Sequence, residues 1–338
     1  MTADEQKRLR LGIGLAVAGV TLAAAGLAAG GDGWSIARLA RALESAEGRT
    51  IVFQIRAPRT VGAWLTGALL GLSGAIAQGL FRNPLAEPYL LGSASGAVLG
   101  VVLVLVTAAL GGHVVSLATA EAVARLGLIG AAFVGALLGV LLTLALARGV
   151  QETTRLLLAG VVVGFVLAAL TDLMTLAAPD ALRGKQAFML GSTGFLGWSS
   201  CAFMGLGFAV TLPVAWRLSR VLDALTLGTE TALSLGVALG RVRVALVAAL
   251  ALATGLAVSQ AGLVGFIGLV SPHLVRRFAP ATHGFTLVAS AAAGGTLLLA
   301  ADVLARTVIA PQEVPVGVLT SLLGGGYLVW LLRRRQRP

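Results

Sequence analysis

The feature that most constrains this chain is a charge-free apolar run over residues 60–81. Its 22 residues are enough for one helix to cross the hydrocarbon core of a membrane, which takes about 20. The segment RAPR (56–59) precedes the run, and the polar break RNPLAEP (82–88) follows it. Pro84 and Pro88 cannot continue the helix, because proline lacks an amide hydrogen and clashes with the preceding turn. The stretch therefore predicts a membrane helix, a tight turn at the membrane face and a returning helix.

The composition extends this interpretation to the whole chain. Charged residues make up only 12% and hydrophobic residues 57%, whereas soluble domains carry about 25% charged residues. This excludes a soluble domain and indicates a polytopic membrane protein. The net charge of +11 comes from short basic clusters between apolar runs. Loop topology explains such clusters better than nucleic-acid binding does, so no nucleic-acid partner is expected.

The residue types needed for catalysis or metal binding are sparse. There is one cysteine, Cys201, and the three histidines, His113, His273 and His283, lie far apart without metal-ligand spacing. No segment matches the phosphate-binding pattern Gly-x-x-x-x-Gly-Lys-Ser/Thr. We therefore expect no catalytic residue, metal site or cofactor in this chain. If ATP drives the protein, another chain must hydrolyse the ATP with its Mg²⁺.

The fold class expected is an all-α polytopic membrane protein, with one transmembrane domain over residues 1–338. Ten spans are expected, at about 11–31, 60–81, 90–111, 126–147, 156–178, 194–216, 244–261, 263–275, 281–301 and 316–332. The charge-free run 244–275 is divided in two because its 32 residues exceed one span and glycines interrupt it. The first run has a basic start like a signal peptide, but its 21 residues exceed the usual apolar core of about 7–15. An uncleaved first span is therefore favoured.

The charge distribution predicts the orientation. Ten spans put both termini on one side, and both termini are basic. Basic loops favour the cytoplasm, so residues 1–10 and the carboxyl terminus are expected there. The long polar loop 217–243 then lies in the cytoplasm as well. Arg56, Arg59 and Arg306 fall outside, against the usual bias, and need another explanation.

Two explanations fit these outer arginines. They can anchor helix ends by extending toward lipid headgroups. Alternatively, Arg56, Arg59 and Arg306 can receive acidic side chains of an external protein through bidentate pairs. Asp302 lies four residues before Arg306, a helical spacing at which the two can simply pair.

The loop 217–243 carries apolar positions of its own and is longer than a simple connection. Thr229 can begin a short helix that ends near Gly236, and Gly228 can join it to a preceding helix. Two such helices predict a knob that docks on a partner. The residues expected to contact the partner are Leu225, Leu227, Gly228, Thr229, Glu230, Ala232, Leu235 and Gly236.

Two further features have functional and structural alternatives. The turn containing Arg82, Asn83, Pro84 and Pro88 is expected near the cytoplasmic face, where it can shape an inner gate. Asp172 lies in the fifth expected span. A carboxylate inside a membrane is a functional candidate, although a position near the span end also allows exposure at the interface.

The motifs together resemble one family. The chain is similar to FecCD-type permeases, the membrane subunits of type II ABC importers for ferric siderophores, haem and cobalamin. The matching segments are RAPR (56–59), GLFRNPLAEPYLLGSASGA (79–97), LLLAG (156–160), LGTETALSLGV (227–237), GLVGFIGLVSPHLVRR (262–277), ADVLAR (301–306) and EVPVGVLTSLLGG (313–325).

The resemblance implies ten helices per subunit, a homodimer and two ATPase subunits on the cytoplasmic side. It implies that Arg56, Arg59 and Arg306 meet glutamates of a periplasmic binding protein. Residues of the 225–237 segment match the coupling helices that seat in the ATPase. The expected function is import of a ferric siderophore or haem across the bacterial inner membrane, with cobalamin as the alternative cargo. An ATP-independent secondary transporter is the alternative from another class, and a non-transporting membrane scaffold is a third.

Overall fold

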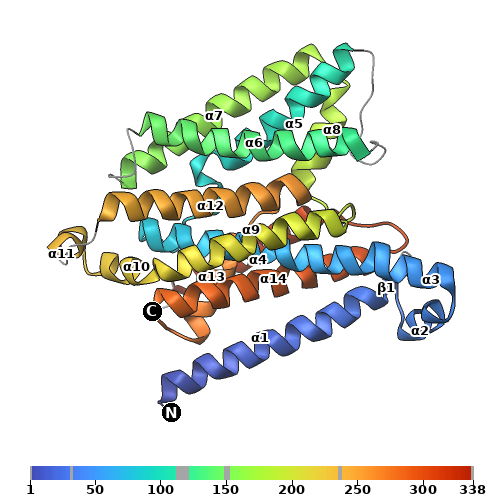
Figure 1. Cartoon of the computed structure of the whole chain (residues 1–338), viewed down its shortest axis with the longest axis horizontal. Helices are drawn as coiled ribbons and strands as arrows, with labels where there is room; N and C mark the ends of the chain where they lie inside the picture. The colour runs from blue at the N-terminus through green and yellow to red at the C-terminus, as the bar shows by residue number, and fades with distance from the viewer. Residues whose placement is uncertain (1, 31–32, 112–121, 148–152, 235–237, 336–338) are drawn as a thin grey trace.

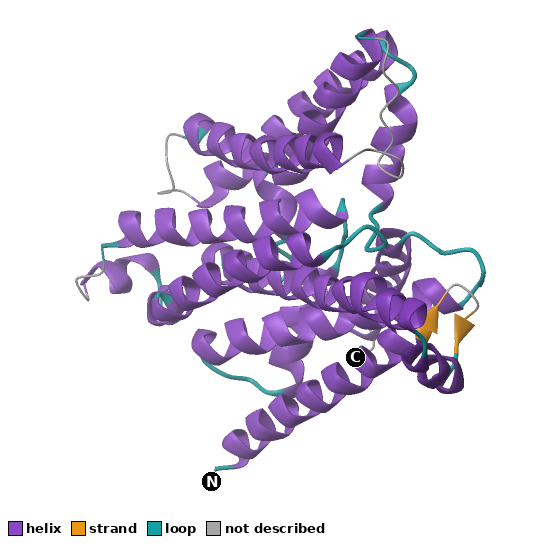
Figure 2. Cartoon of the chain, turned by 45° about the vertical axis from the view of Figure 1, so that its right-hand side comes forward, coloured by secondary structure: helices purple, strands orange, loops and turns teal. Residues whose placement is uncertain are grey.

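The computed structural model describes residues 2–30, 33–111, 122–147, 153–234 and 238–335. Within these ranges the chain is almost entirely helical (Figure 1). Figure 2 shows one small exception, the antiparallel pair β1 (Ala29–Gly30) and β2 (Gly33–Trp34). The expected all-α membrane protein is confirmed.

Among the described residues, eight helices are long and apolar enough to cross a membrane. They are α1 (Ala3–Ala28), α4 (Ala57–Phe81), α5 (Ser93–Leu110), α6 (Ala122–Leu146), α7 (Thr153–Ala177), α9 (Trp198–Arg217), α12 (Leu239–Ala261) and α14 (His283–Thr307). Two more helices lie where the eighth and tenth spans were expected. They are α13 (Ile267–Phe278) and α15 (Val316–Arg335). At about 1.5 Å per residue, α13 is only about 18 Å long and cannot cross the membrane alone.

The remaining helices are short. They are α2 (Ile36–Glu44), α3 (Ala46–Thr50), the π-helical turn η1 (Ile51–Arg56), the 3₁₀ turn η2 (Pro88–Leu91), α8 (Ala181–Leu190), α10 (Ser219–Thr226) and α11 (Thr229–Ser234). Figure 1 shows α10 and α11 at one end of the bundle, together with the start of α1. The helices α2 and α3 and the strand pair lie at the opposite end. We call these the α11 end and the α2 end.

Helix α4 is the centre of the bundle. Its residues from Thr66 to Phe81 are all buried, whereas α1 leaves most of its surface exposed. Helices α14, α12, α13 and α9 pack around α4. Helices α5, α6 and α7 form a second group beside α12, on the side away from α1 (Figure 1).

Glycine allows the closest helix crossings. A Cβ atom at Gly67 would overlap the carbonyl oxygen of Gly294, so α4 and α14 touch backbone to backbone. Gly96 of α5 and Gly135 of α6 meet in the same way. Between membrane helices, close approach through small residues gives the packing contacts that a hydrophobic effect between helices cannot supply. The many glycines of the sequence are thus largely explained by packing.

The structure differs from the expected helix boundaries in three places. Helix α1 begins at Ala3, where the Thr2 hydroxyl and the Glu5 carboxylate form a capping box, so the polar start of the chain is helical. The chain is helical from Ala46 through Phe81, so RAPR (56–59) lies in a helix and not in a loop. Helix α9 begins only at Trp198, because Gly191 has a positive φ of 65° and residues 191–197 form a non-helical segment.

We expect Gly135→Ala to lower the stability of the protein by about 1–3 kcal/mol, because the added methyl group would overlap the α5 backbone at Gly96. Gly130→Ala is the matched control on the same helix, since a Cβ atom there meets nothing within 4 Å. Thermal unfolding in detergent would compare the two. Equal midpoints for the two variants would contradict the close α5–α6 contact.

Candidate functional site

A buried carboxylate organises the α2 end. Asp302, near the end of α14, is completely buried. Its Oδ1 atom accepts hydrogen bonds from Arg59 Nε at 3.0 Å and from the Thr193 hydroxyl at 2.6 Å. Its Oδ2 atom pairs with Arg306, one helical turn further along α14. Arg59 also reaches Glu313 Oε1 at 2.8 Å. We call Arg59, Asp302, Arg306 and Glu313 the Asp302 cluster.

The cluster balances two positive and two negative charges. Such pairing is required in a buried site, because an uncompensated charge out of water costs several kcal/mol. Arg59 comes from α4, Asp302 and Arg306 from α14, Glu313 from the segment before α15, and the hydroxyl of Thr193 from the segment before α9. The cluster and Thr193 therefore tie four parts of the chain together.

Two arginines also hold the end of α1. Arg306 Nη1 donates to the carbonyl oxygen of Gly26 at 3.0 Å, and Arg56 Nη1 donates to that of Leu27 at 3.1 Å. The last carbonyl groups of a helix have no partner within the helix, so these guanidinium groups satisfy them. A Cβ atom at Gly30 would lie 2.5 Å from Arg56 Nη2, so a larger residue there would displace this guanidinium group.

The three arginines expected to dock an external protein do come together at the α2 end. Their exposure differs from the expectation, however. Arg306 is 3% exposed, so the expectation that it faces outward is wrong in this conformation. The alternative of an Asp302–Arg306 pair is confirmed. The Arg59 side chain is 11% exposed and already paired, while Arg56 is half-buried and the Glu313 side chain is 43% exposed.

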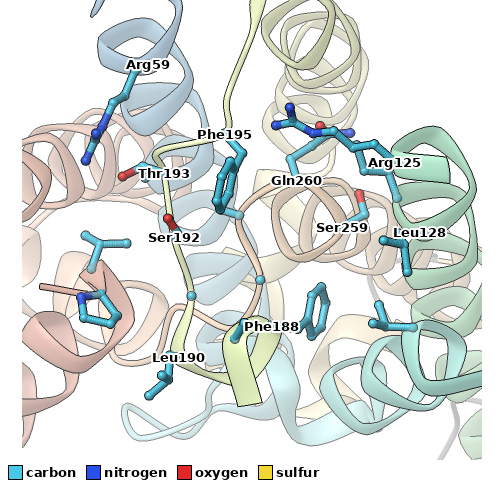
Figure 3. Close-up of a pocket in the computed structure, with 18 of the residues that line it drawn as sticks. Arg59, Arg125, Leu128, Phe188, Leu190, Ser192, Thr193, Phe195, Ser259 and Gln260 are labelled. Carbon is cyan, nitrogen blue, oxygen red and sulfur yellow. The ribbon is translucent and has the colours of Figure 1, made fainter. Parts of the chain in front are cut away.

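A cavity of about 250 Å³ adjoins the cluster (Figure 3). Arg59, Thr193 and Glu313 border it on one side, and Arg125 of α6 lies across from them. Figure 3 shows Phe195 between Arg59 and Arg125, and the Arg125 guanidinium lies 5.5 Å from the centre of that ring. Pockets for drug-sized ligands run from about 300 to 1,000 Å³. This cavity is therefore too small to enclose a bulky chelate within one chain.

The loop between α9 and α12 forms two short helices, as the sequence predicts. Gly228, with a φ of 112°, joins α10 to α11, and α11 begins at Thr229. Leu225 and Ala232 are buried and hold the two helices on the bundle, while Leu227 is 68% exposed. Glu230 is exposed next to it. Of the predicted contact residues, Leu235 and Gly236 lie outside the described residues.

The predicted turn after α4 is present. Arg82 ends the helix with a φ of 50°, and the Asn83 side chain accepts a hydrogen bond from the Leu85 N–H at 2.9 Å. Arg82, Asn83 and Pro84 are exposed at the α11 end. Pro88 is instead buried and packs against Gly268, where a Cβ atom would lie 2.7 Å from the proline Cδ. The four residues of the predicted gate therefore divide between an exposed turn and a buried contact.

Past the turn, the chain that leads into η2 meets the non-helical segment before α13 inside the bundle. The Glu87 carboxylate accepts from the N–H of Phe266, the residue before α13, at 3.3 Å. The Tyr89 hydroxyl donates to the Val264 carbonyl at 2.9 Å. These bonds give the start of the short helix α13 the partners that lipid cannot supply.

Asp172 lies on the outer surface of α7. Its side chain is 71% exposed and pairs with Lys185 Nζ of α8 at 2.5 Å. It does not line the cavity beside the Asp302 cluster. Within the part of the chain that the structure describes, no group of three or more His, Cys, Asp or Glu residues could hold a metal ion.

Sequence reasoning missed four residues of these sites. Thr193, Glu313, Glu87 and Arg125 were not singled out as site residues. Glu87 and Glu313 do stand out as isolated carboxylates within matched motifs, which is a usable signal. Thr193 and Arg125 carry none, because only the folded chain brings them to the Asp302 cluster and its cavity.

Comparisons with known proteins agree with one another. A profile of the FecCD transport family matches residues 12–334. The chain is 39% identical over 295 residues to the haemin transport system permease HmuU of Yersinia pestis, covering 85% of this chain and 84% of that protein. It is 41% identical over 294 residues to the vitamin B12 import permease BtuC of Klebsiella pneumoniae, covering 86% and 84%. A solved structure of a metal-chelate type ABC transporter, in an inward-facing conformation, matches with a TM-score of 0.82 and 26% identity, over 95% of this chain and 98% of that one.

We expect Asp302→Asn to destabilise the protein by about 3–5 kcal/mol, because it leaves Arg306 without a counterion in a buried site. Glu313→Gln serves as the comparison. Its side chain is 43% exposed, and we expect a loss below about 1 kcal/mol. Thermal unfolding in detergent measures both. Equal losses for the two substitutions would show that Asp302 is not the centre of the cluster.

Proposed function

The chain belongs to the FecCD transport family, and from that membership we propose that it is the membrane-spanning permease subunit of an ABC importer for a bulky chelate. The family consists of permease subunits, so the chain itself is not an ATPase. The absence of a phosphate-binding loop from its sequence supports this assignment. The chain would bind no cofactor, while a partner ATPase uses ATP and Mg²⁺.

The observation that carries the proposal is the projecting pair α10 and α11 (Figure 1). Leu227 and Leu233 are 68% and 50% exposed there, beside the exposed Glu230. An apolar knob with a charged side suits a groove in a partner protein. We propose that this knob binds the ATPase subunits, and that movements of the ATPase reach the membrane helices through it.

The orientation follows from this assignment. The α11 end faces the cytoplasm with both termini, and the α2 end faces the periplasm of a bacterial inner membrane. A periplasmic binding protein then docks near Arg56 and Arg59. Because Arg59 already pairs with Glu313, a docked carboxylate would share or exchange that partner. Arg306 would not contact the binding protein directly, and would instead hold Asp302 in place.

The cargo pathway would run between two copies of this chain. The cavity of about 250 Å³ in one chain is too small for the cargo, which supports a pathway formed by a homodimer. The relatives named above carry haemin and vitamin B12. We favour a ferric siderophore or haem as the cargo, with cobalamin as the alternative. The exposed turn at Arg82, Asn83 and Pro84 would border the inner gate.

An ATP-independent transporter is less well supported. It needs an ion-coupling group within the membrane, and Asp172 was the candidate. Asp172 instead pairs with Lys185 and lies outside the lining of the cavity beside the Asp302 cluster. Alternating access driven by the partner ATPase requires no such group, because ATP binding changes the populations of two packings.

We expect Leu227→Asp to reduce binding of the partner ATPase at least tenfold, because it places a charge in the centre of the proposed contact. Leu43→Asp is the matched control, since Leu43 is 41% exposed on α2 at the opposite end. Co-purification of the ATPase with each variant measures the effect. An unchanged yield of ATPase with Leu227→Asp would remove the coupling role of this knob.

We expect Arg56→Glu to weaken binding of the periplasmic protein about tenfold, since charge reversal opposes an acidic partner. The control is Arg49→Glu, an exposed arginine of α3 at the same end, which changes the net charge equally. Titration of the binding protein onto purified permease would measure both affinities. Equal losses would indicate general charge attraction in place of a specific contact at Arg56.

A further inference from the structure

A basic hollow lies at the α11 end, between the end of α9, the start of α10 and the start of α14. It has a volume of about 490 Å³. Arg217 and Arg220 line it, and both are exposed without a hydrogen bond or ion pair in the described part of the chain. Trp216, also in its wall, is 55% exposed. Aromatic and basic residues in this combination are typical of the membrane interface.

The hollow contains one carboxylate, and that group is already engaged. Asp223 Oδ1 accepts from the backbone N–H of His283 at 2.9 Å and lies 2.7 Å from Nδ1 of the same residue. The two arginines outnumber this single carboxylate, so the hollow keeps a positive charge. The hollow is suited to an anion.

An apolar groove begins where the hollow ends. Phe285 lines both. The groove also has a volume of about 490 Å³ and runs between α1 and α14. Its lining residues on α14 extend from Phe285 to Thr296, a distance of about 16 Å along the helix. This is about half of a hydrocarbon core of about 30 Å, or one leaflet.

A third basic residue flanks the mouth of the groove. Arg8 lies one turn before Gly12 on α1, and Gly12 lines the groove. Residues four apart share a helix face. The Nε atom of Arg8 is buried and has no hydrogen-bond partner among the described residues. The charged groups therefore lie at one end of the apolar groove, as the headgroup of a lipid lies at one end of its acyl chain.

We propose that the hollow and the groove together bind one anionic phospholipid. The phosphodiester lies between Arg217 and Arg220, and one acyl chain follows the groove past Phe285. A docked acidic protein would use the arginines but not an apolar groove of one-leaflet depth. The inference rests on the proposed function for its orientation, because anionic lipids carry the negative potential of the cytoplasmic leaflet.

The position of the site gives the lipid a structural role. It contacts α1, α14 and the start of α10, and α10 leads directly into the exposed helix α11. A bound lipid would hold the proposed ATPase-coupling helices against the membrane bundle.

The test uses the full chain, purified in detergent and stripped of lipid. Phosphatidylglycerol and phosphatidylcholine with identical acyl chains are added, and native mass spectrometry measures lipid bound per chain. We expect one phosphatidylglycerol, retained at least fivefold better than phosphatidylcholine. Phosphatidylglycerol has a net negative charge, whereas the choline group neutralises the phosphate of phosphatidylcholine, and each arginine near a net negative headgroup contributes about fivefold. Inorganic phosphate in a parallel titration distinguishes a free anion site from a lipid site, and we expect it to compete only weakly.

Three variants separate the parts of the site. Arg217→Gln with Arg220→Gln should abolish the preference for phosphatidylglycerol. The control with the same charge loss is Arg10→Gln with Arg241→Gln, both exposed and outside the cavity linings, and it should keep the preference. Gly19→Leu should reduce retention of both lipids by filling the groove, where an added Cβ meets nothing nearer than 3.9 Å.

No preference in the wild type, or an equal loss in the two double variants, would overturn the site. If inorganic phosphate displaces the lipid completely, the hollow is a site for free anions and not a lipid site. Thermal unfolding of each variant excludes misfolding as the cause. ATPase co-purification is measured separately, so a wild-type protein that shows no lipid preference but still binds the ATPase would refute this inference alone.

Discussion

The buried charge of Asp302 is the interaction on which the α2 end depends. A lone carboxylate at a fully buried position would be strongly destabilising, so its guanidinium partners are structural requirements. Because those partners come from α4 and α14, and Arg306 also holds the end of α1, one carboxylate fixes three membrane helices. The same bonds place Arg59 and Glu313 beside each other near the surface. Asp302 thus holds in place the region that is proposed to bind the periplasmic protein.

A second constraint acts deeper in the bundle. Non-helical backbone within a membrane must find its hydrogen-bond partners in protein. The chain meets this requirement by crossing two irregular segments, so that Glu87 caps the start of α13 and Tyr89 bonds Val264. Both segments then lead to the α11 end, one back through the exposed turn at Asn83 and one through α13. A movement of α10 and α11 would reach the centre of the protein through these two segments.

Much of this could be predicted from the sequence because it is local. The helix of 60–81, the turn after it, the division of 244–275 near Ala261 and the two short helices around Gly228 all follow from apolar length, proline and glycine. The contacts of Asp302 could be predicted only in part. Its pairing with Arg306 follows from helical spacing, but Arg59 and Thr193 lie 243 and 109 residues away in sequence. Burial of Arg306 was missed for the same reason, since a charged residue at a helix end gives no sign of what covers it.

The central claim is that this permease works only when a partner ATPase drives it through α10 and α11. Uptake into vesicles tests this most directly, with the permease reconstituted together with its ATPase, its binding protein and a labelled haem, ferric siderophore or corrinoid. ATP-dependent uptake of one of these cargoes is the predicted result, and it should stop when the ATPase can bind but not hydrolyse ATP. Uptake at the same rate without any ATPase would contradict the claim and favour a secondary transporter.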